Sequence, residues 1–199
     1  MKQLALADLV HVIAELLPDG PRHLQGSLEG VSVRPSSLKP YLFFRPNMYT
    51  RNLLYRDEQF ELLALCWDGG TRSPVHDHAK QECFFAVHDG AFRIDNFGLR
   101  EGGQAPGFAR LDHEGTLLNV TARMVDHRSS SSDIHRVSLM PGTSRAVSLH
   151  VYARPIDRCL VFDVKGQRCA YSYTRYHSVS GVWRAPVDQT LLTRTPLFP

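Results

Sequence analysis

The chain has 199 residues, a formal net charge of +3, 43% hydrophobic residues and 22% charged residues. This length and composition are typical of one globular domain with a substantial core, and they exclude a disordered chain. The basic residues are scattered and form no run with interleaved aromatic residues, so nothing indicates nucleic-acid binding. No apolar stretch is long enough to span a membrane. We expect a cytoplasmic, monomeric protein in which residues 1–199 form a single domain.

Residues 1–17 predict an amphipathic helix rather than a signal sequence. Apolar residues recur at helical spacing, and charged residues lie between them. Residues 18–40 are rich in Pro, Gly and Ser, which predicts a connecting segment with a short second helix. We therefore expect residues 1–40 to form a helical appendage packed on the rest of the domain.

From residue 41 onward the pattern predicts short strands. Residues 89–90 and 165–167 are typical of hairpin turns, and residues 128–133 predict a loop that contains the serine run 129–132. Near residue 150, apolar and polar residues alternate, so one strand face carries Ser148, His150 and Tyr152. Such strands favour a mainly β antiparallel sandwich or barrel. The predicted strands are residues 60–67, 83–87, 91–97, 117–125, 134–140, 146–153, 159–164 and 169–176.

The four cysteines are Cys66, Cys83, Cys159 and Cys169. They form no CxxC pair, which argues against a zinc ribbon or knuckle. Without a secretion signal, structural disulfides are not expected. We interpret three of them as small buried apolar residues and treat Cys83 separately because of its place in the next motif.

Two histidines, His76 and His78, follow a glycine turn. Alternate residues of a strand point to the same face, so both imidazoles can reach one metal ion. With Gly70 before the pair and Gly90 after it, the segment resembles the first metal-binding motif of the cupin superfamily. That motif usually has a glutamate ligand separated from its last glycine by six residues, and in this chain Cys83 takes that position.

The third metal ligand is expected on a later strand. His135 is the preferred candidate and His150 its competitor, whereas Glu82 remains open as a fourth ligand although it should face the other side of its strand. The remaining histidines have no comparable partners and are interpreted as surface or capping residues. They are His11, His23, His88, His113, His127 and His177.

At this point the sequence resembles the cysteine dioxygenase family, across about residues 41–170. The resemblance is carried by separate motifs in the expected order. They are Tyr49-Thr50-Arg51-Asn52, Cys66-Trp67, His76-Asp77-His78 with Cys83-Phe84, His135-Arg136-Val137 and Ser148-Leu149-His150-Val151-Tyr152.

The resemblance implies a cupin fold, which is a double-stranded β-helix closed into a jelly-roll-like barrel, here with N-terminal α-helices. It implies Fe(2+) held by three histidines, and insertion of both atoms of O2 into the thiol of L-cysteine to give cysteine sulfinate. The implied iron ligands are His76, His78 and His135.

The resemblance also implies roles for the residues around the metal. Arg51 matches the arginine that pairs with the substrate carboxylate. Tyr152 matches the tyrosine that some members join to a cysteine, here Cys83, by a thioether bond. The other matches are Ser148 and His150 with Tyr152 as a hydrogen-bonded triad, Tyr49 and Trp67 as pocket residues, and Cys159 near the pocket mouth.

One departure from the family concerns the segment after the triad. The mammalian-type enzymes continue into Ser-Pro-Pro with a cis proline, whereas this chain continues with Ala153, Arg154 and Pro155. A cis bond is too costly at a non-proline residue, about 2.5–4 kcal/mol, so it lies before Pro155 or is absent. Arg154 becomes a second candidate for binding an anion.

These residue types suit thiol oxidation. Three neutral imidazoles leave positions open on a six-coordinate iron(II), and its charge favours the thiolate of the substrate. Arg51 offers a planar fork for a carboxylate. Tyr152 can donate its hydroxyl to oxygen or to the carboxylate, with His150 expected to hold that hydroxyl and Ser148 to hold His150.

Three other functions remain open. The same site could oxidise 3-mercaptopropionate or another small thiol carboxylate, although related enzymes of that kind usually lack an arginine at the Arg51 position. A metal-binding cupin without catalysis need not keep Arg51 and the Ser148, His150, Tyr152 set together. A zinc hydrolase could use three histidines and a water, with Glu82 as its general base.

Overall fold

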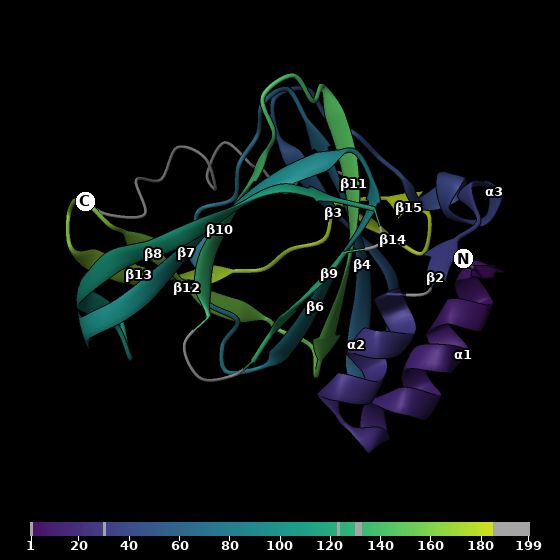
Figure 1. The fold of residues 1–199 in the computed structure, drawn as a ribbon, viewed down its shortest axis with the longest axis horizontal. Helices are drawn as coiled ribbons and strands as arrows, with labels where there is room; N and C mark the ends of the chain where they lie inside the picture. Colours follow the sequence, from purple (N-terminus) through teal and green to yellow (C-terminus); the bar gives the residue numbers. More distant parts are fainter. Residues whose placement is uncertain (1, 30, 123, 130–132, 185–199) are drawn as a thin grey trace.

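A computed structural model of the protein describes residues 2–29, 31–122, 124–129 and 133–184. Helices at the N-terminus pack on one side of a mainly β body (Figure 1). The helical part consists of α1 (Leu6–Leu16), η1 (Leu17–Asp19), α2 (Pro21–Glu29), α3 (Pro35–Leu38) and η2 (Lys39–Tyr41), and it contains the short parallel strands β1 (Lys2–Leu4) and β2 (Val31–Val33).

The amphipathic N-terminal helix is confirmed as α1. Its first turn is capped where Asp8 accepts a hydrogen bond from the Ala5 N–H at 3.2 Å, which satisfies a donor that the helix itself leaves open. The buried face carries Leu6, Leu9 and Ile13, which belong to one core cluster with residues of the β body. The expected connecting segment contains the predicted short helix as α2, and also β2 and α3.

Within the described residues, thirteen further strands form the body. They are β3 (Tyr49–Arg56), β4 (Phe60–Asp68), β5 (Val75–His76), β6 (Glu82–Asp89), β7 (Ala91–Gly102), β8 (Gly107–Thr121), β9 (Val125–Arg128), β10 (Ile134–Leu139), β11 (Arg145–Ala153), β12 (Arg158–Asp163), β13 (Arg168–Tyr173), β14 (Ser178–Val179) and β15 (Val182–Trp183).

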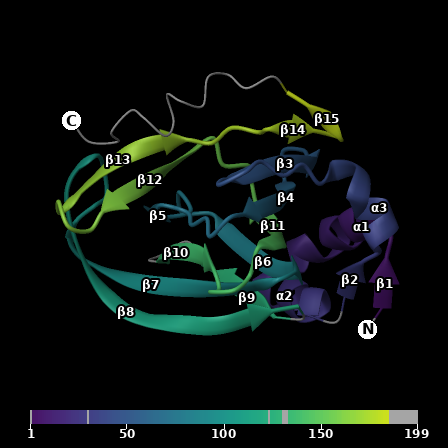
Figure 2. The same ribbon diagram turned by 90° about the horizontal axis from the view of Figure 1, so that it is seen from above.

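The strands form two sheets that face each other. One is a seven-stranded sheet in the order β15-β14-β3-β4-β11-β6-β9, and the other closes as a barrel in the order β10-β5-β12-β13-β8-β7. Figure 2 shows β7 with β8 and β12 with β13 as two long arms, with β5 and β10 between them. The predicted mainly β, jelly-roll-like architecture with N-terminal helices is confirmed.

Two predictions about individual strands are wrong. Residues 89–90 do not close a hairpin, because β6 pairs with β11 and β9 whereas β7 pairs with β10 and β8. The turn instead moves the chain from one sheet to the other. Gly90 has φ +85°, and a Cβ there would lie 2.5 Å from the Cβ of Ala146, so both the conformation and the close approach require glycine.

The second wrong prediction is a strand over residues 117–125. The structure ends β8 at Thr121 and begins β9 at Val125, and β8 itself starts much earlier, at Gly107. The outer parts of β7 and β8 extend beyond the core and are rich in glycine and charged residues. They therefore lack the apolar pattern by which a strand is predicted from sequence. The predicted hairpin at residues 165–167 is confirmed by the pairing of β12 with β13. Of the predicted loop 128–133, residues 130–132 lie outside the described residues.

The strands β4, β6 and β11 separate two apolar clusters. One side of these strands packs against the helices, with Leu62, Phe84 and Leu149 in the same cluster as α1. The opposite side faces the barrel interior and contributes Leu63, Phe85 and Tyr152 to a second cluster. No helix among the described residues is both long and apolar enough to cross a membrane.

Candidate active site

Three histidines meet at the barrel sheet. His76 ends β5 and lies directly opposite His135 of β10 in the strand pairing, whereas His78 follows β5 rather than continuing it. The candidate ligand atoms of the three side chains all lie within 4.8 Å of one another. The expectation that both residues of the His-x-His pair lie on a strand is therefore only half right, yet their side chains still converge.

The protonation of these imidazoles suits metal binding. Burial lowers the pKa of His76 and lowers the pKa values of His78 and His135 well below the ordinary range, because a charged imidazolium loses its hydration there. His76 Nδ1 lies 3.0 Å from the Pro74 carbonyl oxygen, to which it can donate. That tautomer leaves Nε2 as the ligand atom. Three neutral imidazoles are a donor set that fits one divalent metal ion.

Glu82 is not part of this group. It lies on the opposite face of β6 from Cys83 and pairs with His127, whose ring stacks on Phe84 at a centroid distance of 4.7 Å. Strand alternation explains this placement, since adjacent residues of a strand face opposite sides. The possibility of a fourth ligand at Glu82 is thus wrong, and His127 has a specific partner rather than a free surface position.

The polar face of β11 is confirmed, with one change in its hydrogen bonds. The Ser148 hydroxyl lies 2.9 Å from His150 Nε2 and accepts a hydrogen bond from Trp67 Nε1 at 2.9 Å. The expected bond from His150 to Tyr152 is not formed, because His150 Nδ1 has no hydrogen-bond partner within the described part of the chain. The rings of His150 and Tyr152 lie 6.2 Å apart and nearly parallel.

Tyr152 instead reaches toward Arg51 and Cys83. It pairs with Cys83 across β11 and β6, so the two buried side chains share one face of the sheet. Burial, and next the neighbouring Cys83, raise the pKa of Tyr152 well above its usual value, although Arg51 opposes this. Burial also raises the pKa of the Cys83 thiol. Both groups are therefore protonated at neutral pH.

Arg51 points into the same cavity from β3. Its guanidinium carbon lies 5.8 Å from the centre of the Tyr152 ring. Nε and Nη2 of Arg51 are buried and have no hydrogen-bond partner among the residues described. Unpaired buried donors are costly, so these two nitrogens are available to an acceptor on a ligand. The Glu61 carboxylate lies 3.8 Å from Nη2.

A cavity of about 370 Å³ joins these groups. It is lined by the three histidines and by Arg51, Trp67, His150, Tyr152, Tyr49 and Cys159, among others. Tyr49 stacks on Trp67 with ring centroids 4.7 Å apart. Cys159 is partly exposed at the cavity, whereas Cys66 and Cys169 are buried, and all four cysteines are free thiols. The structure therefore gathers most residues of the predicted site around one cavity. Ser148 and Cys83 do not line it, but Ser148 contacts His150 and Trp67, and Cys83 is the cross-strand neighbour of Tyr152.

Arg154 is the exception among the candidates for binding an anion. It is exposed, has φ +80° and does not line the cavity. Its backbone N–H donates to the Gln59 carbonyl at 2.7 Å. No cis peptide bond is present in the described chain, so the bond before Pro155 is trans. Of the two candidate arginines, only Arg51 can meet a ligand in this cavity.

Two residues of the site were missed by sequence reasoning. His177 was interpreted as a surface or capping residue, but it is buried, lines the cavity, and its Nδ1 accepts a hydrogen bond from the Arg51 N–H at 3.0 Å. Glu61 is fully buried beside Arg51. Its signal was present in the sequence, because it is the only charged residue in the apolar run 60–67.

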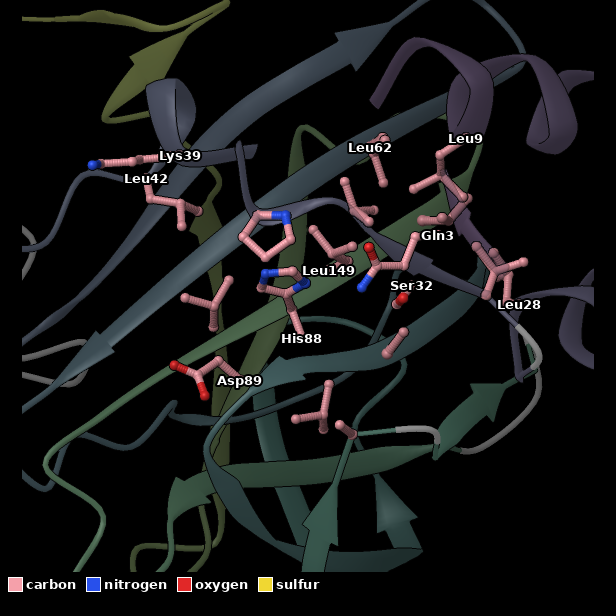
Figure 3. Close-up of a pocket in the computed structure, with 18 of the residues that line it drawn as sticks. Gln3, Leu9, Leu28, Ser32, Lys39, Leu42, Leu62, His88, Asp89 and Leu149 are labelled. Atoms are coloured by element: carbon pink, nitrogen blue, oxygen red, sulfur yellow. The ribbon is translucent and has the colours of Figure 1, made fainter. Parts of the chain in front are cut away.

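A second cavity lies on the other side of the same strands. Its volume is about 590 Å³, and it opens between the N-terminal helices and the sheet (Figure 3). Leu9, Leu28, Leu62 and Leu149 line it, with Lys39, His88 and Asp89 at its polar end. It holds none of the residues that meet at the three histidines, so its larger size does not make it the site of chemistry.

Comparison with known proteins agrees with this geometry. Residues 3–165 match the family model "Cysteine dioxygenase type I". The cysteine dioxygenase type 1 of Rattus norvegicus is 30% identical over 187 residues, covering 92% of this chain and 90% of the relative. The Homo sapiens protein of the same name is 29% identical with the same coverage.

Among solved structures, an uncharacterised Klebsiella pneumoniae protein with a double-stranded β-helix domain superposes with a TM-score of 0.44 at 12% identity. The superposition covers 64% of this chain and 95% of that one. The family match extends over most of the chain and includes the three histidines, Arg51 and the polar face of β11. The protein belongs to the cysteine dioxygenase type I family, which is a family of cupin-fold dioxygenases.

Proposed function

We propose that the protein is an iron(II)-dependent thiol dioxygenase whose substrate is L-cysteine. The observation that carries the proposal is that Arg51 lines the same cavity as the three histidines, while its Nε and Nη2 have no hydrogen-bond partner among the described residues. A small thiol with a carboxylate can span these two groups, with its sulfur at the metal and its carboxylate on the guanidinium. The single oxidised product would be cysteine sulfinate, because both oxygen atoms of O2 would become bound to the substrate sulfur.

His76, His78 and His135 would hold the metal. Iron(II) in this site would supply open coordination positions for a thiolate and for dioxygen. The neutral state of the imidazoles, which burial favours, leaves the full charge of the metal available to ionise the substrate thiol. The histidines thus need no proton release before they bind the metal at neutral pH.

Tyr152 would donate its hydroxyl hydrogen bond to the reacting oxygen or to the substrate carboxylate. Because its pKa lies well above the usual value, the hydroxyl remains a donor throughout the neutral range. Trp67 donates a hydrogen bond to Ser148, and Ser148 is hydrogen-bonded to His150, so the position of the His150 ring beside Tyr152 is fixed. Tyr49, stacked on Trp67, completes the pocket.

We also propose a thioether bond between Cys83 and Tyr152, which their pairing as cross-strand neighbours on one face supports. In that reaction a carbon–sulfur bond forms, the thiol and the ring each lose one hydrogen, and dioxygen is the oxidant. The intact protein would then be lighter by two hydrogen atoms after turnover, and Cys83→Ser would show no such change. An unchanged mass after many turnovers would contradict the cross-link.

The experiment that tests the proposal follows oxygen uptake. The protein is purified without oxygen, loaded with iron(II), and supplied with L-cysteine or 3-mercaptopropionate, with products identified by mass. Faster uptake with cysteine, giving cysteine sulfinate, is the expected result. Faster uptake with 3-mercaptopropionate would reject cysteine as the substrate while retaining the chemistry. No uptake with either thiol by the iron-loaded protein would reject the proposed function.

A further inference from the structure

Glu61 is a buried carboxylate next to the substrate-binding arginine of the proposed function. It lies on β4, opposite Tyr152 of β11 and Arg56 of β3, and its side chain is completely buried. A buried carboxylate is costly unless charged groups and hydrogen-bond donors surround it. A charged residue buried in this otherwise apolar strand therefore needs a structural or functional explanation.

Three groups besides Arg51 contact the Glu61 carboxylate. Oε1 accepts a hydrogen bond from the Ile156 N–H at 3.3 Å, and Oε2 accepts one from the Tyr176 hydroxyl. Arg56 Nη1 lies 3.8 Å from Oε2 and donates to the Tyr176 oxygen at 2.6 Å. Burial, and next the bond to Glu61, raise the pKa of Tyr176 to about 12, so this hydroxyl stays protonated and keeps donating.

The contact between Glu61 and Arg51 is different. Nη2 of Arg51 lies 3.8 Å from Glu61 Oε1, which is beyond hydrogen-bond distance. Two opposite charges at this separation still attract each other strongly when they are buried. Glu61 therefore attracts the guanidinium without occupying its donors, and the Nε and Nη2 edge of Arg51 stays unpaired.

We propose that Glu61 is a positioning residue that holds the Arg51 guanidinium in place. Hydrogen bonds and charge from Tyr176, Arg56 and the Ile156 N–H keep Glu61 from moving closer. The Nε and Nη2 donors of Arg51 therefore remain open for the substrate carboxylate. This inference rests on the proposed function and names the residues that keep Arg51 available to the substrate carboxylate. If Glu61 moved about an ångström closer, it would compete with the substrate for the same donors.

Of the groups that contact Glu61, the Tyr176 hydroxyl can be removed with the smallest change in side-chain shape. In Tyr176→Phe, Glu61 loses a hydrogen-bond donor and its remaining attraction is toward Arg51. The dissociation constant of L-cysteine should rise on the order of tenfold, the effect of losing one charge-assisted hydrogen bond. Binding of 2-aminoethanethiol, which has the thiol and amine but no carboxylate, should not change.

A second substitution separates competition from general loosening. In the double variant Tyr176→Phe with Glu61→Gln, the competing charge is gone, so cysteine binding should recover part of the loss. It should stay weaker than in the wild type, because the attraction that positions Arg51 is lost as well. Damage to the fold alone would weaken both thiols and would grow, rather than reverse, with the second change. Should Tyr176→Phe fold poorly, Arg56→Gln at a partly exposed position removes the pull on the same oxygen and should act in the same direction, more weakly.

The experiment is anaerobic calorimetric titration of the iron(II)-loaded protein with L-cysteine and with 2-aminoethanethiol. Tyr171→Phe, at a partly exposed position on β13 outside the cavity, is the matched control, and iron content is measured for each variant. Weaker binding of cysteine alone, partly reversed in the double variant, is the expected result. Unchanged cysteine binding, equal weakening of both thiols, or no reversal would overturn the role of Glu61. A wild-type protein that does not bind cysteine would overturn the proposed function as well.

Discussion

The two faces of β4, β6 and β11 differ in what they bury. The face toward the barrel carries Glu61, Ser148, His150 and Tyr152, of which His150 and Tyr152 line the cavity with the three histidines. The face toward the helices carries aliphatic and aromatic side chains such as Leu62, which pack with α1. Polar burial costs free energy and apolar burial provides it, so the helical side stabilises strands whose other face is arranged for binding and chemistry.

The largest effect should come from removing one of the three histidines. His76→Ala should abolish metal binding and with it activity, because two imidazoles do not hold a divalent ion firmly in a site with no carboxylate ligand. Metal content per chain and oxygen uptake measure this. His11→Ala, at an exposed position on α1, should keep both. A His76→Ala protein with full metal content would show that the three histidines are not the metal site.

Adjacent leucines of β4 offer a direct comparison of the two faces. Both Leu62 and Leu63 are fully buried, but only Leu62 lines the second cavity. Leu→Ala changes in cores cost about 2–5 kcal/mol of the free energy of unfolding. We expect Leu63→Ala near the upper end and Leu62→Ala near the lower end, because a side chain beside a cavity has fewer neighbours to lose. Urea unfolding measures both, and equal costs would show that the cavity does not loosen the helical side.

Removing the Tyr152 hydroxyl should affect chemistry without affecting the fold. In Tyr152→Phe, turnover should fall roughly a hundredfold, within the range for a lost proton-donating group, while iron content stays at the wild-type level. Steady-state oxygen uptake and iron analysis provide the measurement, with Tyr171→Phe as the control. Wild-type turnover in Tyr152→Phe would remove the tyrosine from the mechanism.

A last prediction concerns the pH dependence of stability in the metal-free protein. Burial lowers the pKa of His150 to about 3 and lowers the pKa values of the three candidate ligands. In the unfolded chain these histidines titrate near pH 6.5, so below that pH they bind protons that the buried histidines of the folded chain do not bind. The free energy of unfolding is therefore unaffected by these histidines above about pH 6.5. Below it, about 1.4 kcal/mol per pH unit is lost for each such histidine.

Unfolding of the metal-free protein by urea at several pH values between neutral and acidic tests this dependence. A His150→Gln variant should show a shallower slope, because one of the buried titrating groups is gone. A free energy of unfolding that stays constant as the pH falls through 6.5 would contradict the neutral state of the buried imidazoles.

The sequence by itself determined the features that depend on local spacing. The helical repeat of α1 and the alternation along β11 were predicted correctly, because side-chain periodicity follows directly from backbone geometry. The pairing of His76 with His78 and the position of Cys83 were likewise read from short motifs. His135 was the preferred third ligand on a later strand, with His150 as its competitor. The resemblance to a known family supplied Arg51, which no local pattern distinguished.

Only the tertiary structure decided which distant residues meet. The pairing of β5 with β10 places His135 opposite His76, and the return of the chain toward β14 brings His177 to Arg51. The same return brings Tyr176 to Glu61. Strand register sets these contacts, and register depends on packing between segments far apart in the chain. For that reason the sequence named candidate groups for the chemistry, whereas the fold decided which groups hold them in position.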